Sequence, residues 1–119
     1  MPSGEITPEI TGFVETYLDC FVSWDILAYF HENPFAERTL SEIALEVGRW
    51  ASAIEPSLGI LVERGVLVEE ISEGDEPSYR YTAGREFKDL MDQFTAVTRD
   101  RTNRLAIVGI VLQKEGKRL

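Results

Sequence analysis

Apolar side chains recur at helical spacing through the first quarter of the chain. The segment Thr7-Pro8-Glu9 supplies a cap hydroxyl, a proline for the first helical position and an acid for the first turn. One apolar stripe then follows at three- and four-residue spacing: Ile10, Phe13, Val14, Tyr17, Leu18 and Phe21. This pattern predicts a helix over about 8–22. A second stripe, shifted in register after Ser23, predicts another helix that stops near Asn33, because Pro34 follows.

A capping box predicts the next helix. In 39-TLSE-42 the Thr hydroxyl and the Glu carboxylate can each satisfy a free backbone N–H at a helix start. This short helix is expected to end at Gly48, because glycine readily adopts a left-handed C-cap conformation.

The stretch 50-WASAIEPSLGILVERG-65 also keeps helical spacing and ends at a glycine. Proline is disfavoured deep inside a helix, because its ring clashes with the carbonyl four residues back. We therefore interpret Ser52 and Glu55 as a second capping box, which would delay the helix start to about Ala53 and leave Pro56 near the first turn.

The second half of the chain predicts a hairpin and then a long helix. The segments 66-VLVEEI-71 and 79-YRYT-82 favour strands, and the acidic segment 72-SEGDEPS-78 favours the turn between them. A helix over about 85–114 follows, with an apolar seam that slips once by four residues. Its segment 105-LAIVGIVL-112 is apolar nearly all round, which fits either a helix buried on several sides or a strand.

The order of these elements resembles the winged helix-turn-helix regulators of bacteria, including the MarR-like and ArsR-like groups. The residues that carry the resemblance are L58-x-x-L61-x-x-x-G65-V66-L67-V68-E69-E70, the acidic turn and 79-YRYTAGREF-87. The resemblance covers about 23–88, with helices added at both ends. The expected fold is mainly α with a small β-hairpin, as a single winged-helix domain over 1–119.

This resemblance implies a DNA-binding transcriptional regulator, with the helix after Gly48 in the major groove and the hairpin on the DNA backbone or minor groove. The implied DNA-binding residues are Arg49, Ser52, Glu55, Ser57 and Arg80. However, the positions that would face the bases carry no Arg, Lys, Asn or Gln, the side chains that usually read base edges. The alternative is a winged-helix module that binds a protein partner instead.

Arg49, Arg80 and the neighbouring Trp50 also have purely structural interpretations. Arg49 could satisfy the last carbonyls of the preceding helix, and Arg80 could pair across the hairpin with Glu69 or Glu70. Trp50 could fold back onto the helix pair as a small satellite core. In the alternative function, Trp50 and the acidic hairpin tip would instead contact the protein partner.

Charge is distributed unevenly along the chain. The net charge is −9, yet residues 83–119 carry eight basic against five acidic side chains. Any basic footprint for nucleic acid must therefore be small or come from the C-terminal segment. The single cysteine, Cys20, suits a reducing compartment. The segment 105–112 is shorter than the roughly 20 residues that cross a bilayer, and MPSGEITPEI does not resemble a signal peptide. We expect a soluble cytoplasmic protein with no membrane partner.

The apolar stripes at the two ends exceed what the expected core can cover, which favours a two-fold homodimer. The expected dimerisation residues are Phe13, Tyr17, Phe87, Phe94, Leu105, Val108 and Leu112. No catalytic constellation is recognisable. In one continuous helix, Cys20 and His31 would stand about 16 Å apart, too far for a nucleophile–base pair. The acids of 69–76 match no calcium loop. We therefore expect no enzyme activity, no cofactor and no metal.

Overall fold

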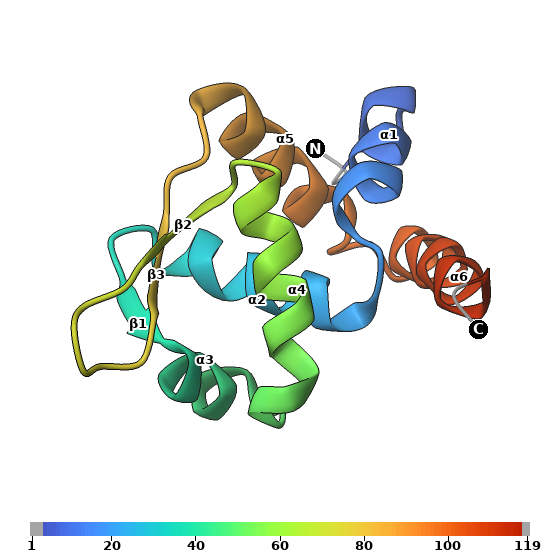
Figure 1. Cartoon of the computed structure of the whole chain (residues 1–119). Coiled ribbons are helices and arrows are strands. Elements are labelled where there is room, and N and C mark those ends of the chain that lie inside the picture. The colour runs from blue at the N-terminus through green and yellow to red at the C-terminus, as the bar shows by residue number, and fades with distance from the viewer. Residues whose placement is uncertain (1–3, 118–119) are drawn as a thin grey trace. The chain divides into compact units, whose positions relative to one another are not determined.

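The computed structural model describes residues 4–117 (Figure 1). This part of the chain forms six helices and a small three-stranded sheet, so the fold is mainly helical, as expected. The elements are α1 (Pro8–Tyr17), α2 (Phe21–Glu32), β1 (Glu37–Thr39), α3 (Leu40–Val47), α4 (Ala51–Glu63), β2 (Leu67–Glu70), β3 (Ser78–Tyr81), α5 (Arg85–Val97) and α6 (Arg101–Lys117). The chain divides into two compact units. The central unit is Val22–Gly84, and the terminal unit combines Met1–Phe21 with Arg85–Leu119.

In the central unit, local sequence signals fix both ends of α3. The Thr39 N–H donates to Glu42 Oε1 at 2.9 Å, and the Glu42 N–H donates to Thr39 Oγ1 at 3.2 Å. Gly48 ends the helix with φ of +71°, a left-handed conformation that favours glycine. The predicted capping box and C-cap are both confirmed.

The start of α4 differs from the sequence prediction. The carbonyl of Trp50 accepts hydrogen bonds from the N–H groups of Ala53 and Ile54, so the helix begins at Ala51. The second capping box of Ser52 and Glu55 was therefore wrong. Pro56 lies inside the helix. The cost is limited because Ser52, whose carbonyl loses its helical donor, is exposed and can be satisfied by water.

The sheet has one strand more than the predicted hairpin. Its order is β1-β3-β2, and both pairings are antiparallel. The extra strand was missed because Glu-Arg-Thr is polar and lacks an alternating apolar pattern. On the central strand β3, Tyr79 and Tyr81 point into the core and Arg80 points to solvent. The ring of Tyr81 lies 6.4 Å from that of Phe30 on α2.

In the terminal unit, α1 packs against α5 through aromatic rings. The Phe13 ring lies 5.4 Å from Phe87 and 5.3 Å from Phe94, and Tyr17 stacks edge-on against Phe87 at 4.8 Å. Phe13, Phe87 and Phe94 are buried and Tyr17 is half-buried. Assigning these four aromatics to a dimer interface was therefore wrong, because the stripes of α1 and α5 cover each other within one chain.

The predicted helix over 8–22 ends early, at Tyr17. Lys114 of α6 binds the last turn of α1. Its ammonium donates to the carbonyl oxygens of Val14 and Glu15, in the last turn of α1, and pairs with Asp19 at 3.0 Å. A lysine a hundred residues away thus adds a donor to the last carbonyls of α1, where that of Val14 also accepts the Leu18 N–H at 2.9 Å.

The predicted helix over 85–114 is two helices, α5 and α6. The Asp100 carboxylate accepts a hydrogen bond from the Asn103 N–H at 2.9 Å and caps the start of α6. The four-residue slip in the apolar seam marks this break. Residues 105–112 are helical, which excludes the strand. Ile107 and Val111 of α6 are buried, whereas Leu105 and Leu112 are 59% and 54% exposed and Val108 is half-buried.

Candidate functional site

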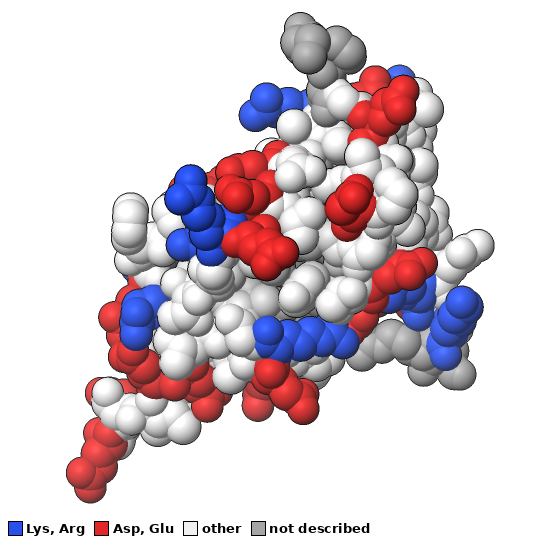
Figure 2. All heavy atoms as spheres, turned by 90° about the horizontal axis from the view of Figure 1, so that it is seen from above, with Lys and Arg blue, Asp and Glu red and all other residues white. Residues whose placement is uncertain are grey.

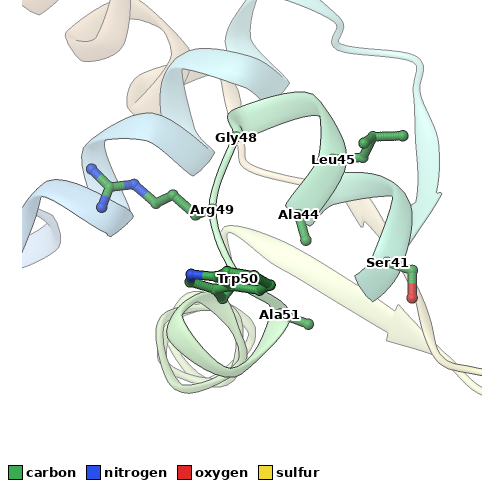
Figure 3. Close-up of a pocket in the computed structure, with 7 residues that line it drawn as sticks. All are labelled: Ser41, Ala44, Leu45, Gly48, Arg49, Trp50 and Ala51. Atoms are coloured by element: carbon green, nitrogen blue, oxygen red, sulfur yellow. The ribbon is translucent and has the colours of Figure 1, made fainter.

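A hollow of about 540 Å³ opens in the central unit where α3 meets the start of α4 (Figure 3). Its walls come from α3, from the turn at residues 48–50 and from the first residue of α4. The lining residues are Ser41, Ala44, Leu45, Gly48, Arg49, Trp50 and Ala51. Most of this lining is apolar, so the hollow offers burial to an apolar group rather than a set of polar ligands.

Two large apolar side chains on this hollow face the solvent. Trp50 is 84% exposed and Leu45 is 83% exposed. The expectation that Trp50 folds back as a satellite core was wrong. The residue has extended backbone angles as the N-cap of α4, and its side chain is one of those drawn on the hollow in Figure 3. An exposed tryptophan beside an exposed leucine is typical of an interaction surface.

Arg49, the one basic residue on the lining, turns away from the hollow. Its Nε donates to Asp25 Oδ2 on α2 at 2.6 Å, and its guanidinium points toward α2 (Figure 3). The prediction that Arg49 satisfies the last carbonyls of α3 was therefore wrong. This ion pair compensates the positive charge, so the hollow itself presents no free cation among its lining residues.

Two acidic side chains, Glu76 and Glu55, lie close to residues that line the hollow. The carboxylate of Glu76, from the turn between β2 and β3, accepts hydrogen bonds from the Ser41 N–H at 2.8 Å and from Ser41 Oγ at 3.0 Å. Glu55 is exposed one turn along α4 from Ala51. The acidic tip is therefore not wholly solvated, because Glu76 binds the N-terminus of α3.

The tyrosine Tyr79 links the sheet to the same acidic surroundings. Its hydroxyl donates to Glu69 Oε2 at 2.7 Å, as part of a directly opposed cross-strand pair. Burial raises the pKa of the Tyr79 hydroxyl, and the hydrogen bond to Glu69 and the charges of Glu69 and Glu55 raise it further. The hydroxyl therefore stays protonated and acts as a donor.

Arg80 pairs across the hairpin, as its structural interpretation predicted. Its Nη2 donates to Glu70 Oε1 at 2.7 Å. This hydrogen bond and the charge of Glu70 raise the pKa of Arg80. Such a pair lies in solvent and stabilises the hairpin only weakly.

The implied DNA-binding residues do not form one surface. Ser52 and Glu55 are exposed on α4, but Ser57 is only 5% exposed and faces the core, so its assignment as a DNA contact was wrong. Figure 2 shows one face of the molecule, on which both basic and acidic side chains are exposed. The candidate site instead depends on Trp50, Leu45 and Glu76, of which Leu45 was not singled out from the sequence. Its sequence signal was an apolar residue on the same side of α3 as the polar Ser41 and Glu42.

Other kinds of site receive no support from residues 4–117. Within that range, no group of three or more His, Cys, Asp or Glu side chains could hold a metal ion. None of the helices described is long and apolar enough to cross a bilayer. Comparisons of the chain with protein-family models, curated proteins and solved structures found no match.

Proposed function

We propose that this chain is a protein-binding module in which the hollow between α3 and α4 receives a partner. The observation that carries the proposal is the exposure of Trp50 and Leu45, at 84% and 83%, on the lining of one apolar hollow. Leaving two such side chains in water is unfavourable, and burying each would contribute roughly 1.5–3 kcal/mol to association. Tryptophan is also enriched among residues that dominate binding energy.

The scaffold for this surface is a winged helix, on our proposal. Its support is the order of elements in the central unit: α2, β1, α3, a short turn, α4 and then the strands β2 and β3. In that arrangement α4 holds the place of a recognition helix and the turn between β2 and β3 is the wing.

The charges of this surface favour a protein over nucleic acid. The outward face of α4 exposes Ser52, Glu55 and Pro56, none of which is basic. The N-terminus of α3, where a phosphate could bind, already holds the carboxylate of Glu76. Arg49 and Arg80 each pair with a carboxylate. A phosphate backbone would meet mostly anions here.

The proposal is tested by quantitative capture from lysate of the source cells with the wild-type chain, Trp50→Ala and Phe35→Ala. Phe35 is the matched control, because it is 96% exposed but does not line the hollow. We expect a set of proteins that Phe35→Ala still captures and Trp50→Ala loses by tenfold or more. If both variants capture the same proteins as wild type, the hollow is not the docking surface.

A DNA-binding transcriptional regulator is the second candidate function. The observation that favours it is the exposed outward face of α4, which follows α3 through the turn at residues 48–50. Its affinity would rest on few charges, chiefly Arg49 and Arg80, each of which would have to leave its carboxylate partner.

We also propose that two copies of the chain associate through α6. Arg104 is the one charged residue among those that α6 exposes between Thr102 and Gly116, which are Thr102, Arg104, Leu105, Ala106, Gly109, Leu112, Gln113 and Gly116. A Cβ at Gly109 would meet no atom of the same chain within 4 Å, so packing inside the chain does not require that glycine. Close approach of a second helix would explain it. Of the predicted dimerisation residues, Leu105 and Leu112 lie on this exposed surface, whereas Val108 is half-buried.

A further inference from the structure

We infer that the partner segment is cationic: one large apolar side chain enters the hollow, and Lys or Arg residues on either side of it meet the acidic rim. This inference rests on the proposed protein-binding function and names the chemistry of its partner. It is carried by the charges that surround the apolar lining, since the lining alone would accept any apolar side chain.

Two glutamates next to lining residues make up the acidic rim, Glu76 beside Ser41 and Glu55 one turn after Ala51. Glu76 is fixed there by its hydrogen bonds to Ser41, a lining residue, at 2.8 and 3.0 Å. Glu55 follows Ala51, another lining residue, by four positions on α4, a rise of about 6 Å. A basic side chain within one turn of the apolar anchor could therefore reach either carboxylate.

The central unit supplies a long-range field of the same sign. Residues 22–84 carry 12 acidic and 4 basic side chains, a net charge of −8 out of the −9 of the whole chain. Arg49 does not offset this field at the hollow, because its guanidinium pairs with Asp25. Such a field attracts cations, and it repels nucleic acid and anionic membrane surfaces.

The hollow is shallow and open to solvent, with a volume of about 540 Å³. Leu45 and Trp50 stand on its lining as the surfaces that one apolar side chain of the partner would cover. The partner is thus a short segment in which a Trp, Phe or Leu is followed or preceded within a turn by basic residues. Electrostatic pairing at the rim then chooses among apolar segments.

The test selects 12-residue peptides from a random phage-displayed library on the full-length chain, with a parallel selection on Trp50→Ala. We expect enriched peptides to contain a large apolar residue and a net positive charge, and to disappear from the Trp50→Ala selection. One enriched peptide is then synthesised and its Kd is measured by fluorescence anisotropy. Raising NaCl from 50 to 300 mM should weaken it by roughly three- to tenfold, because exposed charge pairs are screened.

Matched variants locate the charge effect. Glu55→Gln should weaken the peptide about two- to fivefold, the range for one exposed ion pair. Glu63→Gln, an exposed change two turns further along the same helix, should leave the Kd unchanged.

The outcomes separate the two proposals. Peptides that depend on Trp50 but are neutral or acidic would overturn the cationic partner and leave the protein-binding function standing. The absence of any Trp50-dependent enrichment would overturn both. If the Kd of the peptide changes neither with Glu55→Gln nor with salt, the acidic rim does not determine which peptide binds.

Discussion

The carboxylate of Glu76 accepts two hydrogen bonds from Ser41, one from the backbone N–H at 2.8 Å and one from Oγ at 3.0 Å. Beside it, the Leu40 N–H donates to the carbonyl of Pro77 at 3.3 Å. These bonds join the turn between β2 and β3 to the first turn of α3, where the helix dipole favours a negative charge. The position of the acidic tip is therefore set by α3, which also lines the hollow.

Glu76→Ala should lower the free energy of unfolding by about 1 kcal/mol, the usual cost of losing a charged cap at a helix N-terminus. Urea unfolding followed by circular dichroism measures this change, and hydrogen exchange of the β2 and β3 amides should accelerate as well. Glu73→Ala, on the same turn and exposed, is the control and should stay near wild type. Equal effects of the two substitutions would mean that the link to Ser41 does not stabilise the fold.

Glu42 should titrate below its ordinary pKa of 4.5, because the hydrogen bond from the Thr39 N–H and the contact with its hydroxyl stabilise the carboxylate. A carboxyl whose folded pKa is depressed stabilises the protein above its unfolded pKa and loses that effect as pH falls through the folded pKa. The stability advantage of wild type over Glu42→Gln should thus be full at neutral pH and be lost as the pH falls below 4.5 and through the lowered folded-state pKa. Carbon-13 NMR titration of the Glu42 carboxyl checks the direction directly, and a midpoint at or above 4.5 would contradict it.

The aromatic cluster of the terminal unit should behave as core rather than as an interface. Phe94 is 1% exposed and its ring lies 5.3 Å from that of Phe13. Phe94→Ala should therefore cost about 3–5 kcal/mol, whereas the milder Phe94→Leu should cost roughly 1 kcal/mol and still fold. Chemical denaturation at two protein concentrations distinguishes the roles. The loss should be the same at both, whereas an interface residue would show a loss that depends on concentration.

Structural features that depend on residues close together in the chain could be predicted from the sequence. The capping box of Thr39 and Glu42, the left-handed Gly48 and the pair of Arg80 with the β2 strand depend on neighbours in sequence or on one hairpin register. Each was predicted correctly because the physical partner lies within about ten positions.

The remaining features depend on distant contacts. The last turn of α1 is bound by Lys114, and β1 pairs with β3, some forty residues further along the chain. The mutual burial of the α1 and α5 stripes likewise could not be separated from dimerisation by periodicity alone. For the candidate site, the sequence drew attention to Trp50, but neither its 84% exposure nor the start of α4 at Ala51 was predicted.

Two copies joined through α6 should have twice the chain mass of 13.5 kDa, about 27 kDa, at micromolar concentration. The double change Leu105→Glu with Leu112→Glu should return the protein to 13.5 kDa without loss of helicity, because both side chains are more than half exposed. Size exclusion with light scattering measures the mass. Leu45→Glu is the matched control, since it adds a charge at an exposed leucine of α3 and should leave the dimer intact. A wild-type mass of 13.5 kDa would refute this assembly.

The last prediction concerns DNA. Under the protein-binding proposal, a mixed-sequence duplex of about 30 base pairs should show no saturable binding at 150 mM salt with a Kd tighter than about 10⁻⁴ M, the weak limit of non-specific binding. Glu55→Gln should not change this result, and neither should Arg49→Ala or Arg80→Ala. If the chain is instead a DNA-binding regulator, each arginine change should weaken binding to all sequences and reduce the salt slope by about 1.

Glu55→Gln would then tighten binding, because it removes an anion from the outward face of α4. Fluorescence anisotropy across a salt series measures all four proteins. The stability of each variant must be measured in parallel, because Arg49→Ala also removes the ion-pair partner of Asp25 on α2. Saturable duplex binding that responds in this way would assign the α4 face to DNA and displace the hollow as the primary site. A flat response in every variant would leave the exposed Trp50 and Leu45 as the surface to be explained, and a protein partner explains it.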